Sequence, residues 1–212
     1  MFELTKGANA PLPVDTVRLA LTWHAPVAVN LSALLVGADG TVSSDADFVF
    51  YNQPRHPSGA VYRVGAPGPG SDQLVVTTSA APSWVERVVV VASVDGATFA
   101  ALGAARLDLS DAVGPNLVGF TLTGGPETAM VVAEIYRRGD GWKVRAVAQG
   151  YHDGLAGLAR DYGITVDEAP MPLPAPTPPA PAPATAGTTQ GTPRVSGPID
   201  WLNPPVPSGY EV

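Results

Sequence analysis

The strongest structural signal in this chain is the stretch MVVAEIYRRGDGWKVRAVAQ (Met130–Gln149). Its middle, RGDG (residues 138–141), is a glycine-containing turn sequence between two runs rich in β-branched and aromatic residues. Such a turn between such runs is typical of a β-hairpin, because glycine and aspartate tolerate the backbone angles that a tight turn requires. The stretch therefore predicts two antiparallel strands, Met130–Arg137 and Trp142–Gln149.

The rest of the first 166 residues also favours β-structure. Val17, Leu19, Leu21 and Trp23 fall at every second position, the period of a strand with one buried face. Further short apolar runs, separated by glycine and proline turns, predict strands at 31–36, 48–51, 74–78, 85–94, 105–109 and 118–122. About nine short strands of this kind indicate an all-β fold, a sandwich of two sheets.

One short helix is expected at the end of this domain. Asp153 is placed to cap its first turn, and Gly163 is placed to end it. The residues expected on its apolar face are Leu155, Leu158, Ala159 and Tyr162. A helix of about ten residues needs packing against the sandwich to persist.

The charge balance argues against a nucleic-acid partner. The 212 residues carry a formal net charge of −7, which a phosphate backbone repels. Four basic residues gather around the hairpin turn, Arg137, Arg138, Lys143 and Arg145. They are interpreted as a solvated outer face of the hairpin, with an acidic protein partner as the alternative.

The sequence lacks cysteine, so disulfides, zinc thiolate sites and cysteine nucleophiles are excluded. This composition suits the reducing cytoplasm. The first residues, MFELTKGANAPLPV, do not have the pattern of a signal peptide, and no apolar run approaches the roughly 20 residues of a membrane helix. We expect a cytoplasmic protein without a transmembrane segment.

Composition changes near residue 167, and 13 of the 23 prolines follow it. The run PMPLPAPTPPAPAPA (Pro170–Ala184) cannot form a helix or a central strand, so residues 167–198 are predicted to be a disordered proline-rich linker. Apolar residues return in 199–212, with Trp201, Leu202 and Tyr210. This end is interpreted either as a docking peptide that binds a partner protein or as a segment that packs on its own domain.

Three segments together resemble the TerD family of tellurium-resistance and stress-response proteins. They are ETAMVVAEIYRRGDGWKVRAVAQGYHDGLAGLARDYGI (Glu127–Ile164), LTKGANAPL (Leu4–Leu12) and GADGTVSSDADFVFYNQ (Gly37–Gln53). They occur in family order, and the resemblance covers residues 2 to 166. It implies a two-sheet β-sandwich without an established enzymatic activity, and calcium bound by acidic loops at one end.

The calcium ligands implied by this resemblance are largely replaced. The family pattern Asp-x-Asp-x-Ser matches residues 28–32 here, where Asn30 and Ser32 offer only neutral oxygens. The family's acidic loop matches GAPGPGSDQ (residues 65–73), in which only Asp72 is charged. Calcium prefers six to eight oxygen ligands, several of them anionic, so we expect calcium to bind weakly and no cofactor to be required.

Asp45 and Asp47 are the other candidate ligands. They complete a candidate weak calcium site of Asn30, Ser32, Asp45, Asp47 and Asp72. The favoured interpretation of these two aspartates is that they accept hydrogen bonds from nearby backbone N–H groups of their loop, and the calcium site is the alternative. In the strand that follows, Phe48 and Phe50 are expected to enter the core, and Val49 and Tyr51 to face the other side.

Catalytic motifs are missing from the sequence. It has no Gly-x-Ser-x-Gly nucleophile motif, and His24, His56 and His152 do not have metal-ligand spacing. The favoured function is a non-catalytic, TerD-like binding or scaffold module for stress resistance, whose C-terminal peptide recruits a protein partner. Other tellurium-resistance proteins are candidate partners. The alternative is a calcium sensor or buffer.

Overall fold

The computed structural model describes residues 2–112 and 114–164. The linker 167–198 and the candidate docking residues Trp201, Leu202 and Tyr210 lie outside these residues. The described part is a sandwich of two six-stranded sheets with a short C-terminal helix, which confirms the predicted all-β class. Among the described residues, no helix combines the length and the apolar character needed to cross a membrane.

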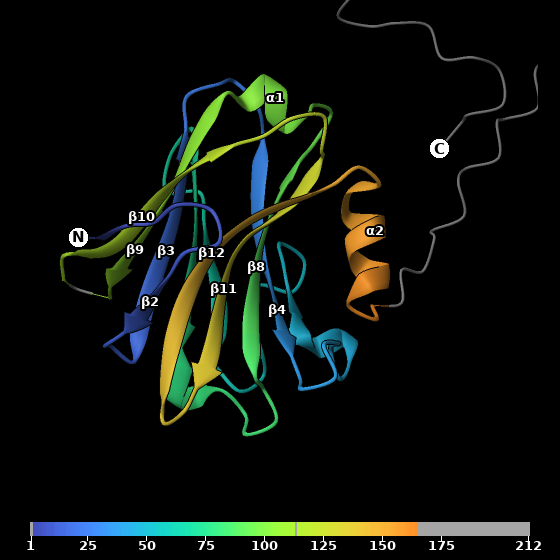
Figure 1. Ribbon diagram of the computed structural model, residues 1–212. Coiled ribbons are helices and arrows are strands. Elements are labelled where there is room, and N and C mark those ends of the chain that lie inside the picture. Colours follow the sequence, from blue (N-terminus) through green and yellow to red (C-terminus); the bar gives the residue numbers. More distant parts are fainter. Residues whose placement is uncertain (1, 113, 165–212) are drawn as a thin grey trace, which may run out of the picture. The chain divides into compact units, whose positions relative to one another are not determined.

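The first sheet has the strand order β1-β10-β9-β3-β7-β6 (Figure 1). Its neighbours are antiparallel, except that β1 runs parallel to β10. The bounds of its strands are β1 (Phe2–Glu3), β3 (Thr16–Trp23), β6 (Val61–Gly65), β7 (Ser71–Thr77), β9 (Ala104–Asp111) and β10 (Asn116–Thr123).

The second sheet has the order β2-β12-β11-β8-β4-β5 and is antiparallel throughout. Its strands are β2 (Asn9–Leu12), β4 (Val29–Val36), β5 (Phe48–Val49), β8 (Arg87–Val94), β11 (Ala129–Arg138) and β12 (Gly141–Tyr151). The predicted hairpin is β11–β12, which turns at Gly139 and Asp140. Gly139 has a φ of +60°, the left-handed conformation that makes glycine suitable there.

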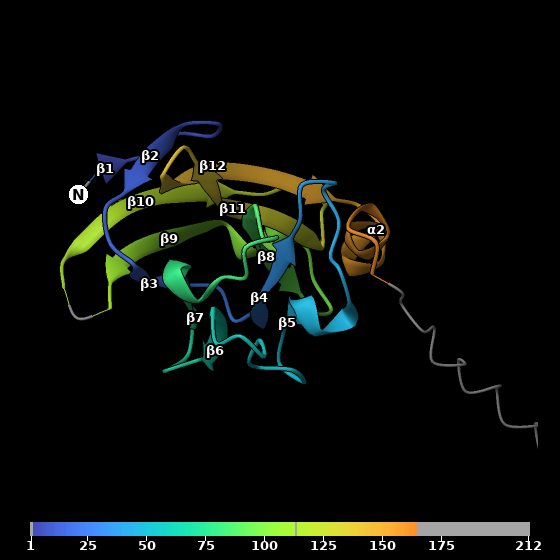
Figure 2. The same cartoon turned by 90° about the horizontal axis from the view of Figure 1, so that it is seen from below.

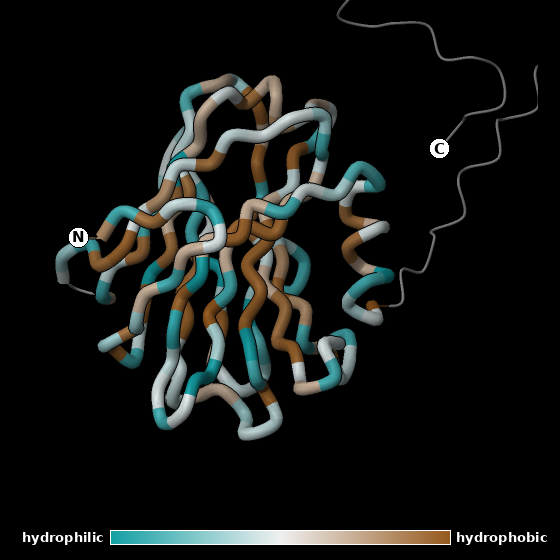
Figure 3. Tube along the Cα trace, in the orientation of Figure 1, coloured by the Kyte–Doolittle hydropathy of each residue, from teal (hydrophilic) through white to brown (hydrophobic). Residues whose placement is uncertain are grey.

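The core fills the space between the two sheets. Its fully buried side chains include Leu19, Leu31, Leu74 and Phe120, which come from both sheets. Hydrophobic residues gather along the strands and hydrophilic residues along the loops (Figure 3). Alternate residues of a strand point to opposite faces. In β4, Leu31 therefore lies in this core, and Ser32 lies on the outer face of the sheet.

A second apolar cluster covers the outer face of the second sheet. Helix α2 (Gly154–Asp161) lies beside β4 and β5 (Figures 1 and 2). Leu158 of this helix packs on the outward-facing residues Leu34, Val36, Val89, Val91 and Val131. Helix α1 (Phe99–Leu102) and two 3-10 turns, η1 (Asp45–Asp47) and η2 (Thr78–Ala80), complete the described elements.

The termini of α2 follow the sequence prediction only in part. Asp153 is the N-cap residue, but its side chain makes no capping hydrogen bond and instead accepts one from Arg160 Nη2 at 2.8 Å. Gly163 has a φ of +72° just after the helix end, as predicted. Leu158 and Ala159 are buried, as predicted, whereas Leu155 is 43% exposed.

The predicted orientation of residues 48–51 was wrong. Val49 is fully buried in the core between the sheets, whereas Phe48 packs on the outer cluster. The strand ends after Val49, because Phe50 and Gln53 exchange backbone hydrogen bonds of 3.0 and 3.2 Å in a turn. The two phenylalanine side chains therefore remain outside the inter-sheet core, with ring centroids 4.7 Å apart.

Candidate functional site

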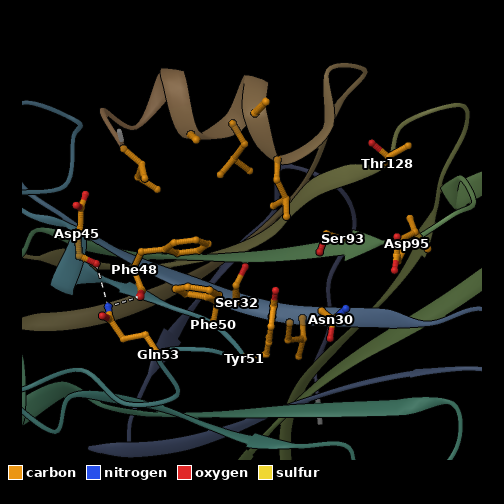
Figure 4. A pocket seen from close by; sticks show the side chains of 17 residues that line it. Asn30, Ser32, Asp45, Phe48, Phe50, Tyr51, Gln53, Ser93, Asp95 and Thr128 are labelled. Atoms are coloured by element: carbon orange, nitrogen blue, oxygen red, sulfur yellow. Dashed lines mark hydrogen bonds between the residues drawn. The ribbon is translucent and has the colours of Figure 1, made fainter. Parts of the chain in front are cut away.

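A groove of about 930 Å³ lies between helix α2 and the outer face of β4 and β8. Figure 4 shows α2 over one side of this groove, with side chains of the sheet and of the β5 turn on the other. Its apolar wall includes Phe48, Phe50 and Leu158. Tyr51 and Leu155, two of the large hydrophobic residues that the fold leaves exposed, also line it. The groove thus offers a partly exposed aromatic and aliphatic surface.

Polar side chains gather at one end of the groove. Asn30 and Ser93 are cross-strand partners on β4 and β8, Asp95 follows β8, and Thr128 precedes β11. Figure 4 places these four side chains together, and Asp45 at the opposite end with Phe48 and Gln53. The lining contains two charged residues, Asp45 and Asp95, and both are carboxylates. The groove is therefore apolar in its middle and negative at its ends.

Ser32 is the unusual residue of the lining. Its side chain is 5% exposed, and its Oγ atom is the buried side-chain oxygen that has no hydrogen-bond partner among the described residues. An unpaired hydroxyl in an apolar setting costs about 1 to 3 kcal/mol. Because Ser32 lines the groove, a bound molecule could supply the missing hydrogen bond.

A buried ion pair closes the edge of β4 immediately before Ser32. Leu31 donates its N–H to Asp72 Oδ2 at 2.7 Å, and Arg63 Nε donates to the Leu31 carbonyl at 3.2 Å. Arg63 and Asp72 also bind each other at 2.6 Å. We call these two side chains the Arg63–Asp72 clamp. It supplies the hydrogen bonds that a neighbouring strand would give, and it joins the two sheets.

The geometry of the clamp depends on Gly70 in the preceding loop. Gly70 has a φ of +70°, and an added Cβ would stand 2.4 Å from the Trp23 carbonyl oxygen. The Gly70 carbonyl in turn accepts the Trp23 N–H at 2.8 Å. This close approach brings Asp72 to the start of β7, where its carboxylate is 1% exposed.

Asp47 fixes the loop at the other end of the groove. Its Oδ2 accepts hydrogen bonds from the backbone N–H groups of Ser43 and Ser44, at 3.0 and 2.7 Å. Its Oδ1 accepts one from His56 Nε2 at 3.0 Å. The backbone role expected for this aspartate is therefore present. Asp45, two residues earlier, is exposed and lines the groove.

The hydrogen bonds of His56 continue to Ser58, but they close a turn. His56 Nδ1 accepts the Ser58 N–H at 3.1 Å and lies 2.8 Å from Ser58 Oγ. Nδ1 thus bonds within the turn, and Nε2 is the ring nitrogen that faces Asp47. Ser58 Oγ also accepts the Ala60 N–H at 3.1 Å. These residues lie outside the lining of the groove.

The five predicted calcium ligands are distributed over different environments. Asn30 Oδ1 and Asp72 both accept from Arg63 Nη2, at 3.4 and 2.6 Å, so the guanidinium group already neutralises Asp72 and occupies the Asn30 oxygen. Asp47 binds His56, and Asp45 and Ser32 line the groove. Among the described residues, no three His, Asp or Glu side chains are grouped as a metal site.

Two tyrosines next to the groove stay neutral at ordinary pH. Burial raises the pKa of Tyr162, which packs on the outer cluster, and the nearby Glu134 carboxylate raises it further. Burial is also the main cause that raises the pKa of Tyr151. Around the groove, negative charge therefore comes from carboxylates and not from phenolate groups.

Comparison with known proteins identifies the family. The model of the TerD domain matches residues 1–162. The tellurium resistance protein TerD of Serratia marcescens is 32% identical over 76% of this chain and 97% of its own length. An uncharacterized protein of Bacillus subtilis, YceE, is 36% identical over 65% of this chain and 79% of its own length. A chemical-damaging agent resistance protein of Clostridium acetobutylicum is 31% identical over 59% of this chain and 99% of its own length.

Solved structures agree with the fold. A protein of unknown function aligns with a TM-score of 0.58 at 20% identity, over 72% of this chain and 99% of its own. A homologue of telluride resistance protein TerD from Streptomyces coelicolor aligns with a TM-score of 0.53 at 21% identity, over 65% of this chain and 90% of its own. The family match and the shared sandwich lead to one conclusion: this chain belongs to the TerD family.

Proposed function

We propose that this TerD-family chain is a non-catalytic binding module. Its relatives are named for tellurium resistance and for resistance to chemical damage, which supports a role in stress resistance. In this proposal the sandwich holds a ligand in the groove under α2, and residues 199–212 recruit a protein partner. Other TerD-family proteins are candidate partners, and relatives named TerA and TerX exist.

The observation that carries the proposal is the groove with its unpartnered Ser32 hydroxyl. Ligand sites are concave, mostly apolar and equipped with a few polar groups, and this groove has those features. The described residues that line it include no histidine, lysine or cysteine. His56 lies outside this lining, with Nδ1 bonded within a turn and Nε2 bonded to Asp47. This arrangement favours binding over acid–base or nucleophilic catalysis.

Calcium is the second candidate ligand. The polar end of the groove gathers side-chain oxygens from Asn30, Ser93, Asp95 and Thr128, which is the ligand type that calcium prefers. Of these residues, Asp95 alone is a carboxylate. We therefore expect weak calcium binding, and a sensor or buffer role is less well supported than the binding of an organic ligand.

Partner recovery from cell extract tests the two parts of the proposal separately. The full chain is compared with a chain that lacks residues 199–212 and with Ala156→Trp. Ala156 is an exposed helix residue that lines the groove, so the indole should fill the groove without disturbing the core. Ala101→Trp, on the exposed side of α1, is the matched control.

We expect the truncated chain to stay folded and to lose its partner. Ala156→Trp should change partner recovery or remove the ligand that accompanies the protein, whereas Ala101→Trp should behave like the unmodified chain. Unchanged recovery after truncation would refute the role of the C-terminal segment. Identical behaviour of Ala156→Trp and Ala101→Trp would refute the role of the groove.

A further inference from the structure

The charge of the groove restricts the ligand that it can hold. Asp45 and Asp95 are its charged lining residues. Among residues 2–112 and 114–164, neither carboxylate forms an ion pair, although other carboxylates of the fold do. An anionic ligand would be repelled at both ends. A ligand with a positive charge would gain a counter-ion on binding.

The wall of the groove restricts the ligand further. Phe48 and Phe50 stack with ring centroids 4.7 Å apart, and Tyr51 meets Phe50 edge to face at 5.4 Å. Aromatic faces attract organic cations and also bury apolar carbon. Leu155 and Leu158 of helix α2 line the same groove. A bare metal ion would leave this apolar surface uncovered, whereas an amphiphilic ligand would cover it.

Ser32 gives the ligand a polar anchor. Figure 4 places Ser32 beside Phe50 and Tyr51, with the polar end of the groove further along, and its Oγ has no partner among the described residues. A protonated amine carries N–H donors for this oxygen. Its positive charge is also favoured by the Asp95 carboxylate further along the groove, because Ser32 pairs with Val91 and Asp95 follows four residues later. The apolar body attached to that amine would lie along Phe48, Phe50 and Leu158.

We propose that the groove under α2 binds a small organic cation, a protonated amine on an apolar body. This inference rests on the proposed function of the groove as a ligand site, and it adds the chemical class of the ligand. The volume of about 930 Å³ lies at the upper end of the range usual for small-molecule sites.

The test is an amide NMR titration of the full chain with three probes that share one body. They are 4-phenylbutylamine, the neutral 4-phenylbutan-1-ol and the anionic 4-phenylbutanoate. The amine should shift the amide resonances of Ser32, Ser93 and Asp95 and bind about tenfold more tightly than the alcohol, as expected for one charge-assisted hydrogen bond in a negatively charged groove. The carboxylate should not bind measurably.

Two variants test whether the charge of Asp95, and not the shape of the groove, favours the amine over the alcohol. Asp95→Asn should weaken amine binding about threefold and leave alcohol binding unchanged. Asp140→Asn, in the exposed β11–β12 turn, removes the same charge elsewhere and should change neither. Because Asp95 and Asp140 are both exposed, both variants should keep the amide spectrum of the folded chain.

Several results would overturn the inference. These are alcohol binding as tight as amine binding, or amine-induced shifts confined to another surface. Amine binding that appears only in a chain ending at residue 164 would instead assign the groove to the chain's own C-terminal residues. Binding of a tetralysine peptide without binding of the amine would assign it to a protein partner. If no probe binds while Ala156→Trp still changes partner recovery, the proposed function stands and the ligand class fails.

Discussion

Two neighbouring residues of β4 show how differently this molecule treats buried polar groups. At Leu31, the Arg63–Asp72 clamp supplies a donor to the backbone carbonyl and an acceptor to the backbone N–H. At Ser32, on the opposite face of the same strand, the buried hydroxyl has no partner among the described residues. The charged groups of the clamp find hydrogen-bond partners within the fold, whereas the Ser32 hydroxyl in the groove has none among the described residues.

This difference separates a structural polar cluster from a binding site. Burying a charged or polar group costs free energy unless the group is paired. The clamp offsets that cost by pairing Arg63 and Asp72 at 2.6 Å, so its loss should damage stability. The groove leaves one hydroxyl and two carboxylates without partners in the described chain. Replacing these polar groups should therefore weaken ligand binding and leave stability nearly unchanged.

The largest expected effect is on the clamp. Asp72→Leu leaves the Arg63 guanidinium and the Leu31 N–H without their acceptor, and we expect it to lower the free energy of unfolding by about 3 kcal/mol or more. Urea unfolding followed by circular dichroism measures this. The double variant Arg63→Met, Asp72→Leu should recover part of the loss, because the unpaired charge is gone. A loss below about 1 kcal/mol in the single variant would show that the clamp contributes little.

Two aspartates at the other end of the groove, Asp45 and Asp47, differ in the same way. Asp47→Ala removes acceptors for Ser43, Ser44 and His56 and should cost about 2 kcal/mol of stability. Asp45→Ala, at an exposed position, should change stability by less than about 0.5 kcal/mol. Thermal unfolding of both variants measures the two losses of stability. Equal losses would contradict the assignment of one aspartate to the fold and the other to the groove rim.

Removing the unpaired hydroxyl should not harm the fold. Ser32→Ala deletes a buried oxygen that lacks a partner in the described chain, so we expect stability to stay equal or rise by up to about 1 kcal/mol. The same urea unfolding measurement applies. A clear destabilisation would indicate that Ser32 Oγ already has a hydrogen-bond partner in the free protein and does not need one from a ligand.

The smallest expected effect is that of calcium. The Arg63 guanidinium already neutralises Asp72, and Asn30 binds the same group, so a divalent ion would have to displace it. At about 1 mM calcium we expect the free energy of unfolding to rise by less than about 0.4 kcal/mol relative to chelator, the gain when the ion concentration equals its dissociation constant. A larger rise would favour the sensor or buffer alternative.

Sequence patterns predicted the sandwich well, because the hairpin turn and the alternation in Val17–Trp23 are strong local signals. They missed β1, β2 and β6. The first has two residues, the second contains Pro11, and the third is a short strand at the edge of its sheet. The orientation of Phe48–Tyr51 failed because the chain turns after Val49, a tertiary constraint that alternation cannot reveal.

The candidate site was less predictable for a related reason. The sequence singled out Asn30, Ser32 and Asp72 through family resemblance, but the partner of Asp72, Arg63, lies on another strand with no local signal. The pairing of Asp47 with His56 is equally nonlocal. One local signal was present: two small polar residues, Asn30 and Ser32, occupy the outward positions of a strand that is otherwise apolar. That pattern indicates that apolar side chains of a covering element do not pack over this part of the strand.

The most direct test of this account is the dissociation constant of 4-phenylbutylamine for Ser32→Ala, measured by amide NMR titration beside the unmodified chain. Loss of one hydrogen bond to a charged donor predicts an affinity about fivefold lower or more, in a variant whose amide spectrum remains that of the folded protein. An unchanged dissociation constant would contradict the claim that the unpartnered serine hydroxyl marks the ligand site.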